Sequence, residues 1–247
     1  MNFPAISDAS AMINFPRARA LERDALLELV DLQSGQTVLD IQAAGGFLSD
    51  EVDRLLEQDV HCVCIEPCEL LGGRLNSRYQ WLRDSVEQFE SVEDGSVDVA
   101  LGLAGLHHSG CHADTIKACQ RVLKPGGELA ICDVEKGAAI ADWLNVFVDR
   151  HNPSGHVGNF LNFGDTASLL RDAGLIDVVE EKKRVPWKFE KKEQVAVFFK
   201  GLFALDLELE QVDEAIGEYF DLQYSDEGVA LDWQLIYCYG RKTRDGE

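Results

Sequence analysis

The sequence predicts an α/β fold built on a doubly wound, mostly parallel sheet with helices on both faces. Short apolar segments that suit strands alternate with segments of helical spacing over residues 17–134. Such alternation is typical of a parallel sheet that is covered on both faces. With 247 residues and an apolar fraction of 46%, the chain is long enough to bury a substantial core. Sheets of this kind bind ligands outside the carboxyl ends of their strands, so the residues there are the first candidates for a site.

The first predicted helix covers residues 17–33, where apolar side chains recur at helical spacing, and Gly35 ends it. Strands and helices then alternate as far as residue 134. The predicted strands are QTVLDIQ, VHCVCIE, YQWLRD, SVDVALGL and ELAICDV. The predicted helices are LSDEVDRLLEQ and HADTIKACQRVL, with PCELLGGRL as a helix or a turn.

After residue 137 the alternation is less regular. A helix is predicted over residues 138–150, followed by a loop rich in Gly, Asn and Pro and by a helix in DTASLLRDAG. LIDVVEEKKRV predicts a long strand, residues 187–228 predict two helices, and VALDWQLIYCYGRK predicts a closing strand. The run EKKRVPWKFEKK holds six of the 23 basic residues and indicates a solvated strand edge protected by lysine.

The charge balance argues against nucleic-acid partners. The chain has 44 Asp and Glu against 23 Lys and Arg, a formal net charge of −21 that repels phosphate backbones. The amino terminus has no basic region before an apolar run, and no segment approaches the ~20 apolar residues of a membrane span. We therefore expect a cytoplasmic protein that binds neither nucleic acid nor membranes.

No metal site is predicted from the cysteines. The chain has seven, several of them in apolar strand-like runs where cysteine behaves as a small hydrophobe, so free thiols are expected. The cluster of His61, Cys62, Cys64 and Cys68 has no paired C-x₂-C arms and fits no common zinc spacing.

The first turn must be aligned in the correct frame. The dinucleotide fingerprint G-x-G-x-x-G would need glycine where the chain has Gln42, Ala44 and Phe47. In the frame D-x-G-x-G-x-G, Asp40 is the acidic lead residue and Gly46 is the last glycine. The turn therefore disfavours a nicotinamide dinucleotide, and it still leads into a helix whose first amides favour an anion.

The ends of the later predicted strands also carry polar residues or turns that suit a ligand site. Glu66 ends the second predicted strand, where a carboxylate can accept hydrogen bonds from both hydroxyls of a ribose. Asp84 ends the third, DGSVDVALGLAGLHHS contains the fourth, and RVLKPGGELAICDV contains a turn and the fifth. In this order and at these intervals, the segments over residues 17–135 resemble those of the class I S-adenosylmethionine-dependent methyltransferases.

The resemblance implies a seven-stranded, Rossmann-like methyltransferase fold with an antiparallel last strand. It implies S-adenosylmethionine as cofactor and S-adenosylhomocysteine as product. Glu66 would then hold the ribose, Asp84 would accept from the adenine amino group, and neighbouring side chains would line the base. The residues implied to bind the cofactor are Asp40, Gln42, Ala43, Ala44, Gly45, Gly46, Glu66, Pro67, Asp84, Ser85, Val86, Gly102 and Leu103.

The turn departs from the family at Gln42 and Ala44, where glycine is usual. A Cβ atom at these positions takes space and disfavours positive φ. We expect cofactor binding to survive with altered contacts. The departure also motivates an alternative, a pseudoenzyme that keeps the fold for binding or partner interaction. A nicotinamide oxidoreductase is disfavoured by the failed fingerprint, and a nucleic-acid methyltransferase by the net charge.

The expected reaction is methyl transfer to a small-molecule acceptor, on O, N, C or S, by in-line displacement. Alignment and exclusion of water supply much of the acceleration of such a step. A base is needed only if the acceptor must lose a proton to become nucleophilic. The candidates for that role are His108, after the fourth strand, and His156, in the loop expected to cover the pocket.

We expect one methyltransferase-like domain over residues 1–247. Its predicted parts are an N-terminal helical segment (1–34), a cofactor-binding core (35–136), a pocket-covering helix and loop (137–164) and a helical insertion (187–228). The insertion has an apolar face that would suit a lid over the acceptor pocket, a homodimer surface or plain core packing. This face consists of Phe198, Phe199, Leu202, Phe203 and Leu205.

Overall fold

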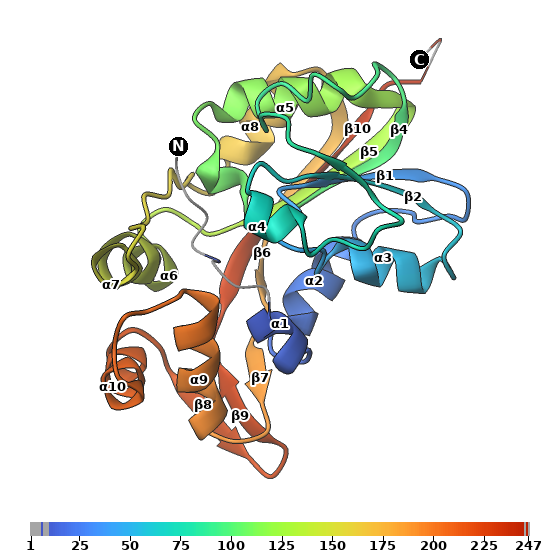
Figure 1. Cartoon of the computed structure of the whole chain (residues 1–247). Coiled ribbons are helices and arrows are strands. Elements are labelled where there is room, and N and C mark those ends of the chain that lie inside the picture. The colour runs from blue at the N-terminus through green and yellow to red at the C-terminus, as the bar shows by residue number, and fades with distance from the viewer. Residues whose placement is uncertain (1–5, 7–9, 245, 247) are drawn as a thin grey trace.

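A seven-stranded sheet forms the centre of the molecule in the computed structural model, which describes residues 6, 10–244 and 246 (Figure 1). The strand order is β3-β2-β1-β4-β5-β10-β6. The strands are β1 (Thr37–Ile41), β2 (His61–Ile65), β3 (Gln80–Leu82), β4 (Val97–Leu103), β5 (Leu123–Asp133), β6 (Leu175–Arg184) and β10 (Gln234–Lys242). The N-terminal predictions for residues 1–5 and 7–9 lie outside the described residues.

The pairing confirms the predicted fold class. β3, β2, β1, β4 and β5 pair in parallel, whereas the last strand, β10, is antiparallel to both of its neighbours. The chain crosses from one side of β1 to the other between β3 and β4, so strand order reverses between β1 and β4. Ligands of open α/β sheets bind at the carboxyl ends of strands at such a point.

Helices cover both faces of the sheet (Figure 1). They are α1 (Ser10–Asn14), α2 (Ala20–Leu27), α3 (Ser49–Leu55), α4 (Glu69–Gly72), α5 (His112–Val122), α6 (Ala139–Asp142), α7 (Asp149–His151), α8 (Asp165–Asp172), α9 (Glu193–Leu202) and α10 (Leu209–Tyr219), with a 3₁₀ turn η1 (Leu106–His108) and a π-helical segment η2 (Trp143–Val148).

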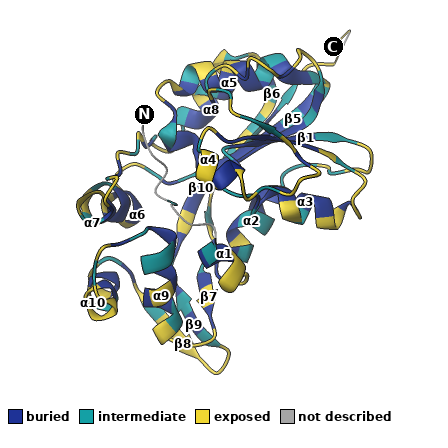
Figure 2. Ribbon diagram, viewed as in Figure 1, coloured by how far each residue is buried: buried dark blue, intermediate teal, exposed yellow. Residues whose placement is uncertain are grey.

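Successive side chains of a strand point to opposite faces of the sheet, and this divides the hydrophobic core into two clusters. On β1, Val38 belongs to the cluster that contains the buried residues of α2 and α3, and the next residue, Leu39, belongs to the cluster under α5 and α8. Both side chains are at most 2% exposed. The central strands are accordingly buried on both faces, as Figure 2 shows, which is why their sequences are apolar.

Residues 187–228 contain α9 and α10, and they also contain two strands, β7 (Trp187–Phe189) and β8 (Leu222–Ser225), that the sequence does not predict. With β9 (Gly228–Leu231), these strands form a second, antiparallel sheet in the order β7-β9-β8. The predicted closing strand is therefore wrong as one unit, because it is interrupted after β9 and continues in the main sheet as β10. The short β8 is mostly exposed and has no apolar pattern to identify it.

Two further expectations can be compared with the structure. The basic run begins within β6, and β6 is the edge strand of the main sheet, as predicted. The five residues of the apolar face on the insertion are all buried within the chain. Two of them, Leu202 and Phe203, also line the cavity described below. Among the helices of the described residues, none is both long and apolar enough to cross a membrane.

Candidate functional site

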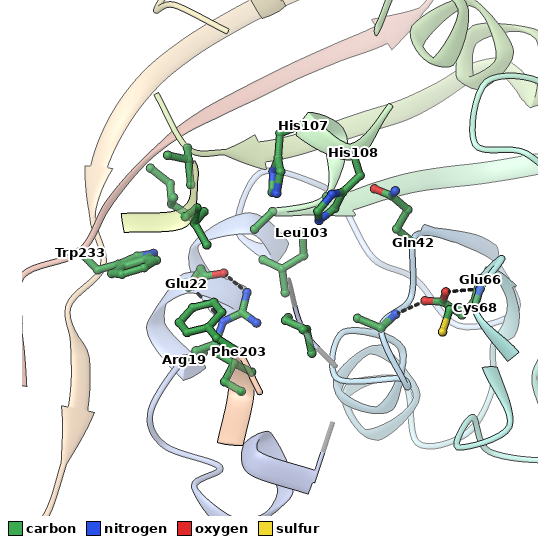
Figure 3. Close-up of a pocket in the computed structure, with 18 of the residues that line it drawn as sticks. Arg19, Glu22, Gln42, Glu66, Cys68, Leu103, His107, His108, Phe203 and Trp233 are labelled. Atoms are coloured by element: carbon green, nitrogen blue, oxygen red, sulfur yellow. Dashed lines mark hydrogen bonds and ion pairs between the residues drawn. The ribbon is translucent and has the colours of Figure 1, made fainter. Parts of the chain in front are cut away.

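A cavity of about 320 Å³ lies at the carboxyl ends of β1 and β4 (Figure 3). This volume falls in the range of small-molecule sites. One end is formed by the first turn and the end of β2, and we call it the cofactor end. It is lined by Gln42, Ala44, Glu66, Pro67, Cys68 and Glu69. The other, the acceptor end, is lined by Arg19, Glu22, Leu144, Trp187, Leu202, Phe203, Trp233 and Leu235.

The first turn keeps a glycine-like backbone although its glycines are replaced. Gln42 has a φ of 60° and Ala44 a φ of 46°, both in the left-handed region. The amide of Ala43 between them donates to the Ile65 carbonyl at 3.0 Å, which ties the turn to β2. A left-handed conformation costs a residue with a Cβ about 1–2 kcal/mol. The surrounding structure therefore holds the turn in a shape that its sequence disfavours.

Gln42 brings a polar group to the cofactor end. Its Oε1 atom is buried and has no hydrogen-bond partner within the described part of the chain. Its side chain fills the space beside Gly105, where an added Cβ would collide with this oxygen. A buried amide oxygen without a donor is costly, so this atom is a candidate ligand contact.

Glu66 links the two turns at the cofactor end. Its carboxylate accepts the backbone N–H of Ala44 at 2.9 Å and that of Cys68 at 2.8 Å. The side chain is only 4% exposed, and burial raises the pKa of the carboxyl group while the two backbone donors oppose the rise. Each carboxylate oxygen has a second lone pair. The group can therefore accept ligand hydroxyls while it holds the turns in place.

Asp40 lies beneath the first turn and does not line the cavity. It is fully buried and accepts a hydrogen bond from Ser49 Oγ at 2.6 Å. Burial raises the pKa of this carboxyl group to about 7, although the Ser49 bond opposes the rise. The residue supports the turn from below, at the point where α3 begins.

Six of the residues predicted to bind the cofactor or to act as a base line the cavity, and the others of that set do not. The six are Gln42, Ala44, Glu66, Pro67, Leu103 and His108. Asp84 accepts from the backbone N–H of Ser91 at 2.5 Å and from its hydroxyl at 2.8 Å, while Val86 is buried in the core. The remaining residues outside the lining are Asp40, Ala43, Gly45, Gly46, Ser85, Gly102 and His156.

The acceptor end is an aromatic wall, and Phe203 is the one of its three rings that the sequence suggested for a lid over the acceptor pocket. Trp187 and Trp233 stack with ring centroids 3.8 Å apart, and Phe203 adds a third ring to the lining. These rings come from β7, from the segment before β10 and from the end of α9. No local motif joins them, because only the folding of the insertion onto the sheet brings them together.

A buried ion pair lies beside this wall. Arg19 and Glu22 form it across one turn at the start of α2, with side chains 5% and 0% exposed. Trp187 Nε1 donates to Glu22 Oε2 at 2.8 Å, and the Arg19 guanidinium lies 5.5 Å from the Trp187 ring centroid. The pair is thus satisfied within the protein, and the acceptor end has no net charge from these two residues.

Histidines stand between the two ends. His107 and His108 line the cavity from η1, and the ring of His156 lies 5.2 Å from that of His108. Burial and the neighbouring rings lower the pKa of His108 well below its ordinary value, and burial lowers that of His156 to about 4. Both rings are therefore neutral near pH 7. A pKa this low makes His156 a weak general base.

The family comparison agrees with this geometry. A family model described as a methyltransferase domain matches residues 39–131, which contain the first turn, Glu66 and η1. A ubiquinone biosynthesis O-methyltransferase of Xanthomonas euvesicatoria pv. vesicatoria is 30% identical over 166 residues. These residues cover 63% of this chain and 69% of that relative.

Solved structures share the fold. The YcgJ protein from Bacillus subtilis aligns with a TM-score of 0.64 at 16% identity, over 90% of this chain and 98% of that one. A 1,6-didemethyltoxoflavin-N1-methyltransferase from Burkholderia thailandensis, solved with 1,6-didemethyltoxoflavin and S-adenosylhomocysteine, aligns with a TM-score of 0.52 at 18% identity. This second match covers 91% of this chain and 79% of that one.

The strand order with its antiparallel last strand, the cavity at the point where that order reverses, and a relative at 30% identity all lead to one assignment. The chain belongs to the class I S-adenosylmethionine-dependent methyltransferase family.

Proposed function

We propose that this chain transfers a methyl group from S-adenosylmethionine to a small acceptor with an apolar or aromatic body. The observation that carries the proposal is that one cavity joins the Glu66 turn to the aromatic wall. Its size suits ligands of small molecular weight. A net charge of −21 further disfavours a nucleic-acid acceptor.

The residues at the cofactor end fit the cofactor. Glu66 has spare lone pairs for ribose hydroxyls, and Gln42 has an oxygen without a partner in the described structure. We assign cofactor contacts to Asp40, Gln42, Ala43, Ala44, Gly45, Gly46, Glu66, Pro67, Asp84, Ser85, Val86, Gly102 and Leu103. The bound cofactor supplies a methyl group that is already activated by the sulfonium charge. The chain's own part is to hold this group toward the acceptor end and to exclude water.

The acceptor end selects by shape and polarity. Its rings are buried, and its one ion pair is internally satisfied, so a charged acceptor would lose hydration without gaining a partner. A flat, uncharged acceptor that stacks on the Trp187–Trp233 pair fits best. The relatives are named O-methyltransferases, which favours oxygen as the atom methylated, ahead of N, C or S.

We assign part of the wall of the acceptor end to the two segments expected to cover it, residues 137–164 and 187–228, within one domain of residues 1–247. Leu144 comes from the first segment, and Phe203 comes from the second. These segments would close over the acceptor and leave residues 35–136 to hold the cofactor. A homodimer stays a prediction.

A turnover assay tests the proposal. The full chain is incubated with S-adenosylmethionine and, in separate reactions, with catechol, aniline, thiophenol and glycine, and S-adenosylhomocysteine is measured by mass spectrometry. We expect turnover on an aromatic probe and none on glycine. The variant Trp233→Leu should raise the KM for the aromatic probe and leave S-adenosylhomocysteine affinity unchanged. Turnover on glycine alone, or no binding of S-adenosylhomocysteine, would contradict the proposal.

A further inference from the structure

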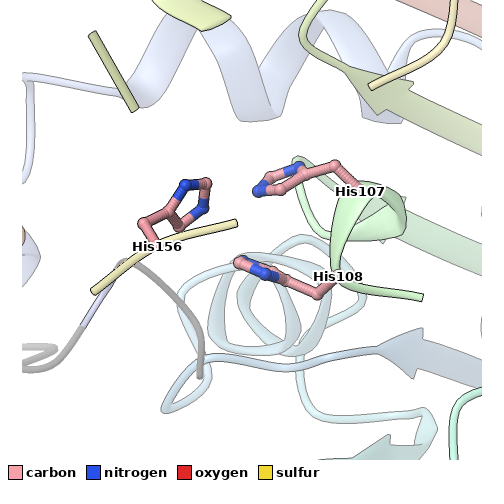
Figure 4. Close-up of side chains that lie close together, drawn as sticks. All are labelled: His107, His108 and His156. Carbon is pink, nitrogen blue, oxygen red and sulfur yellow. The ribbon is translucent and has the colours of Figure 1, made fainter. Parts of the chain in front are cut away.

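Three histidine rings meet at one side of the cavity (Figure 4). His107 and His108 belong to η1, and His156 belongs to the loop after α7. The ring centroids are 4.1 Å apart for His107 and His108, 5.5 Å for His107 and His156, and 5.2 Å for His108 and His156. Each ring offers one nitrogen, and these three nitrogens all lie within 4.8 Å of one another. The three rings therefore face one shared space.

The hydrogen bonds of Asp133 determine which nitrogen of His107 is free. The carboxylate accepts the backbone N–H of His107 and that of Val134, both at 2.7 Å. A carboxylate only accepts, so His107 Nδ1, at 2.7 Å from Asp133 Oδ1, must be the donor. In the neutral ring, Nε2 then carries a lone pair.

Asn145 determines the tautomer of His156 in the same way. The amide orientation is set because Asn145 Oδ1 accepts the Gly158 N–H at 2.7 Å and Nδ2 donates to the Gly158 carbonyl at 2.9 Å. His156 Nδ1 lies 3.0 Å from this same Oδ1 and must therefore donate to it. His156 Nε2 is consequently a bare acceptor.

One nitrogen of each of the three rings has no hydrogen-bond partner among the described residues. His107 Nε2, His108 Nδ1 and His156 Nε2 are all buried, and none of them has a hydrogen-bond partner in the part of the chain that the structure describes. A buried polar nitrogen without a partner is unfavourable, so a ligand that pairs with it would stabilise the site.

We propose that His107, His108 and His156 bind one divalent transition-metal ion, with Zn²⁺ as the best match. Three imidazoles with one open position are typical of catalytic zinc, and imidazole suits this group of metals. A carboxylate or carbonyl oxygen that accepts from the far ring nitrogen is the usual support for such ligands, and Asp133 and Asn145 supply it here. Zn–N bonds of 2.0–2.1 Å place ligand nitrogens about 3.4 Å apart, so the rings would turn inward on binding.

The open position would face the cavity, because His107 and His108 line it. A bound ion there would hold an acceptor hydroxyl or amine by its lone pair and lower the pKa of that group. This role rests on the proposed function, whereas metal binding does not. Spacing along the chain does not predict this metal site, because His156 is far from His107 and His108 in the sequence.

Metal titration of the full, tag-free chain tests the proposal. After dialysis against a chelator, Co²⁺ and Zn²⁺ are titrated separately, with calorimetry for both and the visible absorption of Co²⁺ as a signature of its ligands. We expect one ion per chain. His108→Ala and His156→Ala should each weaken binding more than 100-fold, and Asp133→Asn should weaken it 10–100-fold. His61→Ala and His151→Ala, which alter histidines outside the cluster, should leave it unchanged.

Near-UV circular dichroism checks that each variant is folded, and S-adenosylhomocysteine is titrated into the same samples. Absence of stoichiometric binding to the wild type at about 1 mM metal would overturn the proposal, whatever the variants do. Binding that survives in folded His108→Ala and His156→Ala would overturn it too. Metal binding without S-adenosylhomocysteine binding would contradict only the proposed function, and the reverse would contradict only the metal site.

Discussion

The cofactor end and the acceptor end of the cavity are built from different kinds of sequence. The cofactor end consists of turns that follow β1 and β2, so each of its residues lies beside a strand that positions it. The acceptor end takes single side chains from α2, β7, α9 and the segment before β10. The first depends on local backbone geometry and the second on tertiary packing, which explains why sequence patterns identify only the first.

The two ends also differ in how their polar groups are satisfied. At the cofactor end, Gln42 Oε1 has no partner in the described structure and Glu66 has spare lone pairs. At the acceptor end, Arg19, Glu22 and Trp187 satisfy one another. The first arrangement leaves capacity for polar ligand contacts, and the second leaves an apolar surface with a rigid polar support behind it.

The largest effect is expected for Glu22→Ala, which tests the Arg19–Glu22 pair behind the aromatic wall. The substitution leaves Arg19 buried without its partner, and breaking a buried pair in this way costs about 3–5 kcal/mol. Urea unfolding followed by circular dichroism measures the loss. The matched control is Arg83→Ala, which breaks an exposed pair with Glu69 and should cost far less. Equal effects of the two variants would show that the acceptor end does not depend on its ion pair.

At the cofactor end, Asp40 should make stability depend on pH. Its folded pKa of about 7 lies above the ordinary value of 3.8, so the folded state favours the protonated form. The contribution of protonated Asp40 to the free energy of unfolding is fully present below about pH 4 and is lost as the pH rises through about 7. Its total is on the order of 4 kcal/mol. Asp40→Asn should remove it. The free energy of unfolding is compared for both proteins from pH 4 to 8, and parallel curves would contradict this account of Asp40.

Ligand affinity separates the two ends directly. Glu66→Gln removes a buried charged acceptor and should weaken S-adenosylhomocysteine binding about 10–100-fold, as expected for charge-assisted hydrogen bonds. Calorimetry measures the change. Glu69→Gln alters a carboxylate that lines the same cavity but is 79% exposed, and it should have little effect. If both variants bind as the wild type does, Glu66 is not a ligand contact.

The smallest effect concerns the strained turn. Ala44→Gly should relieve about 1–2 kcal/mol of left-handed strain, offset by about 0.5–1 kcal/mol from the freer unfolded chain. The net gain in unfolding free energy is therefore between zero and about 1.5 kcal/mol. Ala43→Gly is the control, because Ala43 is buried and its φ is not positive, so it should destabilise. A loss of stability from both substitutions would show that the turn is not strained at Ala44.

The same contrast explains what the sequence predicted. The parallel strands were recognisable because burial on both faces makes them apolar, and Glu66 was recognisable because it ends one of them. Strands β7 and β8 of the small sheet were not, since they are short and β8 is mostly exposed. The Trp187–Trp233 stack and the Arg19–Glu22 pair could not be predicted, because no spacing along the chain encodes contacts between distant segments.

For some residues predicted to bind the cofactor, the sequence did not show the backbone conformation or the hydrogen-bond partners that the structure shows. The left-handed φ values of Gln42 and Ala44 run against their residue types, so only the structure shows that the turn keeps its shape. Asp84 is at the end of β3 as expected, but its carboxylate is engaged by Ser91. Whether Asp84 turns toward adenine when a ligand binds stays a prediction.

A crystal structure of the chain with S-adenosylhomocysteine would test the assignment of the cofactor end and the acceptor end. We expect the ribose hydroxyls to lie within hydrogen-bond distance of the Glu66 carboxylate and the sulfur atom to face the Trp187–Trp233 stack along the cavity. Binding at any other place, or in this cavity with the sulfur turned away from the aromatic wall, would contradict the assignment of the two ends.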